Sequence, residues 1–231
     1  MKYLTFSFDD GVEQDKRLIG IFDKYSLKAT FNLNSELLGK SGQLVYPNCT
    51  VAHNKVNPEE VKSLYKNHEV AAHTLTHPNL TGLSDEEVIR QVEQDRLNLS
   101  ALTGCNVVGM AYPCGGVNNN EHTASLIKHN TGIKYARTIS DTFSLDVPQN
   151  PYRFDPTLRH RCDRDKMAEM IEKFVSFKGS ETKLFYIWGH SYECDMDDSW
   201  EYFESVCCAL SGLSDVFYGT NTEVFKEIYG I

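Results

Sequence analysis

Short apolar segments alternate with helical segments along the whole chain, and this alternation restricts the fold more than any other feature of the sequence. Eight apolar segments have the length of strands: residues 3–8, 29–33, 70–72, 107–111, 134–138, 157–160, 184–188 and 216–218. Helical segments between them carry start and stop signals, such as Ser84 with Glu87 at one start and Gly104 at the same helix's end. Repeated strand and helix units form parallel sheets. We therefore predict an α/β fold, a compact and distorted (β/α) barrel with seven or eight parallel strands.

One domain is expected to span residues 1–231. A chain of 231 residues with 41% hydrophobic content can bury one large core. No internal repeat, charge run or low-complexity linker divides it. Residues 39–57 are the longest irregular stretch, and we expect them to form a loop over the functional site.

The first strand ends on two adjacent carboxylates, Asp9 and Asp10, followed by a glycine. The third strand is followed by His73 and His77, which are four residues apart. Two imidazoles at this spacing, together with a carboxylate from another strand, can hold one divalent ion and leave positions open for water and substrate. The carboxyl ends of barrel strands are where active sites are built. A turn and helix cap for the two aspartates, and ordinary loop positions for the histidines, remain the alternatives.

Four segments resemble the motifs of the polysaccharide deacetylase family, of the chitin-oligosaccharide and peptidoglycan deacetylase type. They occur in the family's order, as residues 6–11 (Phe-Ser-Phe-Asp-Asp-Gly), 73–77 (His-Thr-Leu-Thr-His), 111–115 (Ala-Tyr-Pro-Cys-Gly) and 188–190 (Trp-Gly-His). The first two match closely. The last two are degraded, because Ala111 stands where the family has arginine and Trp188 where it has leucine.

The resemblance implies a (β/α) barrel and a metal-dependent hydrolase that removes N-acetyl groups from an amino sugar or oligosaccharide. Asp10, His73 and His77 would hold the divalent metal. Zinc is the first choice, and cobalt, nickel, iron and manganese also suit such a ligand set.

The same resemblance implies a role for each remaining candidate residue. Asp9 would take a proton from the attacking water, and His190 would donate one to the departing amine. The backbone N–H of Cys114 would hold the carbonyl oxygen. The substrate-binding residues would be Tyr112, Pro113 and Trp188, with simple core packing as the alternative for the two aromatic rings.

The arginine missing at Ala111 requires a substitute if Asp9 is to be oriented as a base. Arg137 ends the next predicted strand, and adjacent strand ends in a barrel lie close together. We therefore predict that its guanidinium contacts Asp9. The alternative is that Arg137 forms a structural ion pair and that catalysis is weakened.

Two further functions stay open at this stage. One is a related C–N hydrolase for a small amide or ureide that is not a sugar. The other is a carbohydrate-binding descendant that has lost turnover.

Charge and cysteine content limit the partners and the compartment. The formal net charge of -9 argues against nucleic acid or an anionic membrane as partner and favours neutral or cationic substrates. The N-acetylated saccharide is the partner that the family resemblance implies. The seven cysteines, an odd number, are expected to be buried reduced thiols. With no export signal or membrane span in the sequence, a cytoplasmic location is expected. The oligomeric state is left open.

Overall fold

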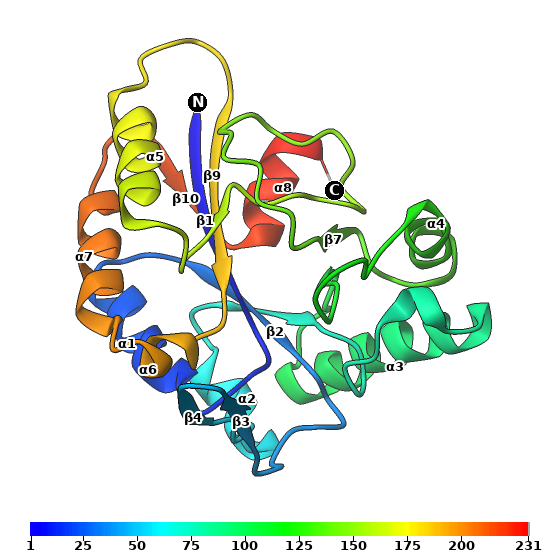
Figure 1. The fold of residues 1–231 in the computed structure, drawn as a ribbon. Helices are drawn as coiled ribbons and strands as arrows, with labels where there is room; N and C mark the ends of the chain where they lie inside the picture. Colours follow the sequence, from blue (N-terminus) through cyan, green and yellow to red (C-terminus); the bar gives the residue numbers. More distant parts are fainter. Residues whose placement is uncertain (231) are drawn as a thin grey trace.

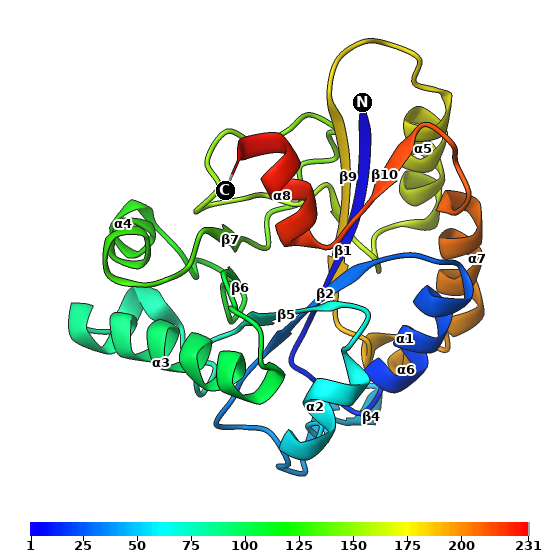
Figure 2. The same cartoon turned by 180° about the vertical axis from the view of Figure 1, so that it is seen from behind.

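The computed structural model describes residues 1–230 and contains one large curled sheet with helices on its outer side (Figures 1 and 2). Eight strands form this sheet: β1 (Lys2–Asp9), β2 (Ala29–Leu33), β5 (Glu69–Ala72), β6 (Gly109–Ala111), β7 (Tyr135–Arg137), β8 (Leu158–Arg159), β9 (Lys183–Gly189) and β10 (Val216–Tyr218). Every pairing within it is parallel. The predicted α/β class and parallel strands are confirmed, and each predicted strand segment contains or overlaps an observed one.

The strand order is β7-β6-β5-β2-β1-β9-β8, so the first strand lies near the middle of the sheet. One edge of β1 is shared, because Lys2 pairs with Val216 of β10 while Phe6 pairs with Ala29 of β2. Within residues 1–230, the two ends of the sheet meet through a single isolated parallel bridge between Arg137 and Phe154. The sheet is therefore a half-barrel, as expected of a distorted barrel.

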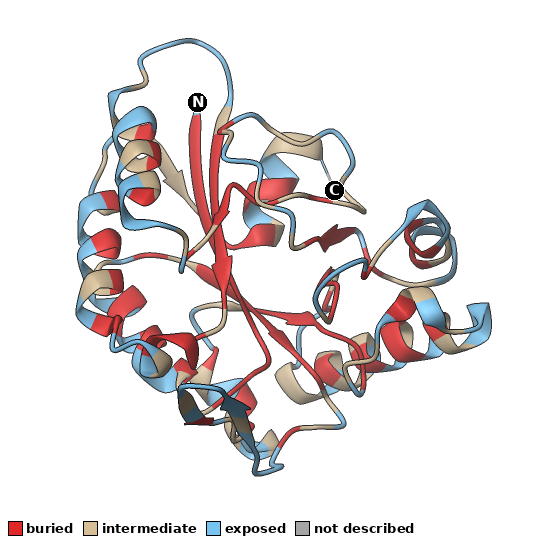
Figure 3. Cartoon of the chain, in the orientation of Figure 1, coloured by how far each residue is buried: buried red, intermediate tan, exposed pale blue. Residues whose placement is uncertain are grey.

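Eight α-helices connect the strands: α1 (Asp15–Lys24), α2 (Pro58–Leu64), α3 (Asp85–Thr103), α4 (Glu121–Asn130), α5 (Arg164–Ser176), α6 (Glu193–Met196), α7 (Trp200–Leu210) and α8 (Asn221–Tyr229), with a short 3₁₀ turn at Leu80–Gly82. Buried positions follow the strands and the sheet-facing sides of the helices (Figure 3). In the part of the chain that the structure describes, no helix combines the length and the apolar character that a membrane crossing requires.

The predicted start and stop signals of α3 act as expected. The Ser84 hydroxyl accepts from the amide of Glu87, and Gly104 ends the helix in the left-handed region with φ of 76°. At α8, Thr220 and Glu223 bond each other's backbone amides in a full capping box.

Helix α8 fills the end of the barrel opposite the carboxyl ends of the strands. Its first residue, Asn221, accepts from the hydroxyl of Thr5 at 2.9 Å and donates to that of Tyr186 at 2.6 Å. Further along, the ring of Phe225 packs against Tyr135 and Phe154, with centroids 4.6 and 4.3 Å apart. Because this end is closed by packed side chains, a substrate can enter only from the other end.

Residues 39–57 lie beside the predicted site residues, as expected, but the expectation that they are irregular is wrong. This stretch contains an antiparallel hairpin of β3 (Gln43–Tyr46) and β4 (Cys49–Ala52), in which Leu44 pairs with Val51. The strands are short and mostly exposed, so they lack the apolar alternation that reveals a strand. The glycine, proline and asparagine residues around them favoured a loop in the sequence.

All seven cysteines are free thiols, but the expectation that they are buried is mostly wrong. Only Cys194 and Cys207 are buried, and Cys105 and Cys208 are exposed.

A methyl group at Gly109 should test how tightly the barrel interior is packed. A Cβ there would lie 2.0 Å from ring atoms of Tyr135, whose hydroxyl is fixed by a 2.7 Å bond to Glu69. We expect Gly109→Ala to lower the free energy of unfolding by about 1–3 kcal/mol in chemical denaturation. Gly20→Ala is the control, because nothing lies within 4 Å of the added methyl and the helix should gain about 0.5–1 kcal/mol. Equal effects of the two changes would contradict this packing.

Candidate active site

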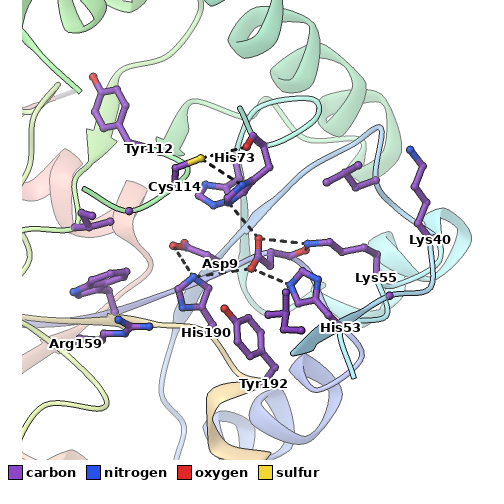
Figure 4. A pocket seen from close by; sticks show the side chains of 18 of the residues that line it. Asp9, Lys40, His53, Lys55, His73, Tyr112, Cys114, Arg159, His190 and Tyr192 are labelled. Carbon is purple, nitrogen blue, oxygen red and sulfur yellow. Dashed lines mark hydrogen bonds and ion pairs between the residues drawn. The ribbon is translucent and has the colours of Figure 1, made fainter. Parts of the chain in front are cut away.

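A cavity of about 540 Å³ opens at the carboxyl ends of the strands (Figure 4). Its walls include most of the residues singled out in the sequence: Asp9, Asp10, His73, His77, Tyr112, Cys114, Trp188 and His190. The hairpin β3–β4 and the segment after it form another wall, with Leu44, Tyr46, His53 and Lys55. The barrel therefore gathers these residues from four strand ends and one hairpin around a single cavity.

Asp10, His73 and His77 each offer a ligand atom, and these atoms lie within 4.8 Å of one another. Asp10 Oδ1 is 3.7 Å from His77 Nε2, and the two imidazole rings are 4.9 Å apart. His73 Nδ1 lies 2.9 Å from the carbonyl oxygen of Ala111. Because that oxygen can only accept, Nδ1 carries the proton and Nε2 is left free for a metal. The donor set and its orientation fit one divalent ion.

The charges of these three residues also suit a metal ligand set. Burial lowers the pKa of His73 to about 4 and lowers that of His77, so both imidazoles are neutral near pH 7. Burial alone would raise the pKa of Asp10, but the hydrogen bond from His53 and the charge of Lys55 hold it well below the usual range. Neutral imidazole and ionised carboxylate are the forms that bind metal ions.

The loop carrying the two histidines is held from β2 and from α3. Asp95 of α3 accepts from the amide of His73 at 3.0 Å, and Asn34 donates to the carbonyl of Thr74 at 2.9 Å. Thr74 and His77 both have positive φ, 69° and 63°. Residues other than glycine tolerate this conformation only where surrounding contacts impose it.

Asp9 and Arg137 form a buried ion pair. The guanidinium Nη2 lies 2.5 Å from both carboxylate oxygens of Asp9, and Asn32 donates to the same carboxylate at 2.8 Å. Arg137 can reach this point because it is the register partner of Ala111 on the neighbouring strand. Burial raises the pKa of Asp9, but the charge and hydrogen bonds of Arg137 together with the neighbouring imidazoles of His73 and His190 outweigh it and bring the pKa below its ordinary value. The predicted contact is present, and the predicted role in orienting a base stays a prediction.

His190 follows β9 and faces both aspartates, with Nε2 3.9 Å from Asp9 Oδ2 and 4.0 Å from Asp10 Oδ2. Its Nδ1 lies 3.5 Å from the buried carboxylate of Glu193. Burial would lower the pKa of His190, but the nearby carboxylate of Glu193, together with those of Asp10 and Asp9, raises it above its ordinary value. Glu193 is itself paired with Arg159 and with His160, the latter at 2.8 Å.

Sequence reasoning missed three residues that contact the predicted site residues: His53, Lys55 and Glu193. His53 Nε2 lies 3.1 Å from Asp10 Oδ2, and Lys55 Nζ is 2.7 Å from the Asp10 carbonyl oxygen. Both come from the segment after the hairpin, and Figure 4 shows their side chains among those that line the pocket. Nothing in that segment's composition marks it as part of a site. The contact of Glu193 with His190 could have been predicted from the sequence, because a carboxylate three residues after a histidine can reach it across one helical turn.

The structure gives mixed results for the residues predicted to bind the acetyl group or the sugar. Cys114 lines the cavity with φ of 69° and turns its thiol toward His77, 3.8 Å from Nδ1. The hydroxyl of Tyr112 points away and donates to the carbonyl of Tyr152, leaving the ring at the cavity wall. Pro113 is buried and does not line the cavity, so it shapes the turn. Trp188 lines the cavity but is only 5% exposed.

The sequence matches the family model for polysaccharide deacetylase over residues 1–136, more than half of the chain. The chain belongs to the polysaccharide deacetylase family. Members of this family remove N-acetyl groups from sugars and depend on a metal ion. The match ends one residue before Arg137, so Arg137, Glu193 and His190 lie beyond it. No curated protein sequence matches this chain.

Solved structures similar to this family member agree with the fold. The Xyl-CE4 domain of a multidomain xylanase from the Trinervitermes trinervoides hindgut metagenome is 16% identical, with a TM-score of 0.59 over 99% of this chain and 92% of that one. A family 4 carbohydrate esterase from Streptomyces lividans, in complex with acetate, is 14% identical, with a TM-score of 0.57 over 90% and 87%. A family 4 pseudoenzyme from Bacillus anthracis is 17% identical, with a TM-score of 0.60 over 97% and 66%.

This family member spans about half the length of two other matched chains. It covers 55% of a deacetylase from Streptococcus pyogenes and 49% of a polysaccharide deacetylase from Bacillus cereus.

Replacing His53 should weaken metal binding. Partners that hydrogen-bond a metal ligand typically contribute 10- to 100-fold to metal affinity, so we expect His53→Gln to raise the zinc dissociation constant by about that factor in chelator competition. His122→Gln is the matched control, because His122 is exposed on α4 and bonds Asp85. Equal affinities of the two variants would show that the hairpin segment does not support Asp10.

Replacing Glu193 should shift the alkaline limb of the pH–rate profile. Glu193 raises the pKa of His190, so Glu193→Gln should lower that pKa, and a required imidazolium would then be lost at lower pH. We expect the alkaline limb to move to lower pH and kcat to fall at neutral pH. Glu169→Gln, on the exposed side of α5, is the control. If the alkaline limb does not move, His190 is not the proton donor.

Proposed function

We propose that this chain is a divalent-metal hydrolase that removes the N-acetyl group from an amino sugar or a short oligosaccharide. One observation carries the proposal: a paired carboxylate and a paired imidazole, Asp9 and His190, lie 3.9 Å apart beside the three-residue ligand set. Their environments push their pKa values apart, downward for Asp9 and upward for His190. Such a pair can supply one ionised base and one protonated acid at the same pH.

The metal would be held by Asp10, His73 and His77, and zinc suits two imidazoles and one carboxylate. When bound, the ion supplies Lewis-acid polarisation of the acetamide carbonyl and a more acidic water. Cobalt, nickel, iron and manganese are the alternatives to test.

The chain's own groups would carry the proton transfers. Asp9, fixed by Arg137 and Asn32, accepts the proton of the attacking water. His190, held by Glu193, donates a proton to the amine nitrogen as the C–N bond breaks. The amide of Cys114 would stabilise the developing negative charge on the carbonyl oxygen.

The cavity supports a small substrate. A volume of about 540 Å³ is in the range of pockets that enclose a small ligand, and the hairpin wall narrows the approach of a polymer. We propose a monosaccharide or short oligosaccharide on this basis. A cytoplasmic location is part of the proposal and is supported by the odd number of cysteines.

Two substitutions separate metal binding from proton transfer. His77→Ala should remove most bound metal together with activity, whereas Asp9→Asn should keep the metal and lose turnover. The measurements are elemental analysis of purified protein and acetate release from a panel of N-acetylated saccharides. Thermal unfolding controls for stability, because Asp9→Asn leaves Arg137 buried without a charged partner.

Each outcome of this experiment decides between functions. Equal metal loss in both variants would contradict the separate roles. Metal binding with ammonia or carbamate release from small amides would select the related C–N hydrolase. Saccharide binding without acetate release would select a non-catalytic descendant.

A further inference from the structure

Trp188 lies under two guanidinium groups. The guanidinium carbon of Arg137 is 4.7 Å from the centre of its ring, and that of Arg159 is 5.3 Å away. The indole N–H donates to Asp141 at 2.7 Å. Cations within about 6 Å of an aromatic ring centre are attracted to its face, most strongly where water is excluded. A ring that is 5% exposed and covered in this way has little free surface for a sugar, which argues against the substrate-binding role predicted for it.

The two arginines support different halves of the site. Arg137 is fully buried and holds the carboxylate of Asp9. Arg159 pairs with Glu193, and Glu193 in turn lies 3.5 Å from His190 Nδ1. The indole is therefore the group that both arginines share, between the proposed base and the proposed acid.

The buried guanidinium of Arg137 has few hydrogen-bond partners, so the aromatic face of Trp188 matters to it. Its Nη1 donates to the carbonyl of Thr138 and its Nη2 is taken by Asp9, while its Nε is buried without a hydrogen-bond partner within residues 1–230. A leucine at position 188 would offer no attraction to a cation. The two departures from the family motifs, Ala111 and Trp188, thus belong together: the arginine sits one strand away, and the tryptophan covers it.

We propose that Trp188 is a positioning residue that fixes Arg137 and Arg159, and through them Asp9 and His190. The proposal rests on the deacetylase activity proposed above. It assigns to the tryptophan an effect on turnover and not on substrate affinity.

The test compares Trp188→Leu and Trp188→Phe with the same changes at Trp200. Trp200 is the chain's other tryptophan, and its surroundings match: Arg17 lies 4.6 Å over the ring, the indole N–H donates to Asp195 at 2.7 Å, and the residue does not line the cavity. Misplacing catalytic groups by about 1 Å costs about 100-fold in rate, so we expect Trp188→Leu to lower kcat by about 10- to 100-fold with KM nearly unchanged. Trp188→Phe keeps an aromatic face and should lose much less. The Trp200 variants should keep kcat.

A second readout does not depend on turnover. The Arg137 Nε–H is buried and should exchange slowly with water in the wild type. By NMR, this exchange should be faster in Trp188→Leu and unchanged in Trp200→Leu. If the wild type releases acetate from no saccharide, the proposed function fails. The NMR comparison still shows whether the indole covers the guanidinium of Arg137.

Two results would overturn the proposal. A raised KM with normal kcat in Trp188→Leu would make the indole a substrate platform. Normal kcat together with an unchanged exchange rate of the Arg137 Nε–H in Trp188→Leu would show that the ring does not hold the arginine.

Discussion

The buried ion pair between Arg137 and Asp9 depends on the curl of the sheet. The two residues belong to β7 and β1, which are separated by three strands in the sheet order. Neighbouring strands lie about 4.8 Å apart, so a flat sheet would hold β7 and β1 roughly 19 Å from each other. Contact between the two side chains requires the sheet to bend until its inner faces meet. The helices outside and α8 at the closed end hold that curvature.

A buried ion pair is rarely justified by stability alone, because removing two charges from water costs about as much as their attraction returns. Here the pair has a second consequence. It helps to hold the pKa of the buried Asp9 below its ordinary value, while Glu193 raises the pKa of His190. Two groups 3.9 Å apart can then perform opposite proton transfers without exchanging roles.

The departures from the family motifs show which property of the site is retained. The position of the arginine in the sequence changes, but Ala111 and Arg137 are register partners, so the guanidinium reaches the same level of the barrel from the next strand. Structural similarity alone does not establish activity, since the matched folds include both a carbohydrate esterase with acetate and a pseudoenzyme. The pairing of Asp9 with Arg137 and of His190 with Glu193 is the feature on which the proposed activity rests.

The hairpin β3–β4 adds a wall that the barrel itself does not require. Val51 buries against Val12 and Tyr192, which anchors the hairpin to the first strand's turn and to the segment after His190. His53 and Lys55 then reach Asp10 from that anchored position. The proposed metal site and the shape of the cavity are therefore both linked to this hairpin and the segment after it.

The sequence by itself determined the strands of the main sheet and the end of that sheet at which the chemical groups lie. Apolar runs locate the eight strands, and Ser84, Gly104 and Thr220 mark helix ends, because these effects act within a few residues. Since polar residues directly follow strands that run parallel, their convergence on one face could be foreseen.

Only the tertiary structure decided which groups meet. The contacts of His53 with Asp10 and of Glu193 with Arg159 join residues 43 and 34 positions apart, and they depend on the path of a weakly patterned hairpin and on the curl of the sheet. The face of Trp188 could be read as a sugar platform or as a cover for a cation, since an aromatic ring serves both. Its neighbours across the barrel, which no local pattern encodes, favour the second role that we propose.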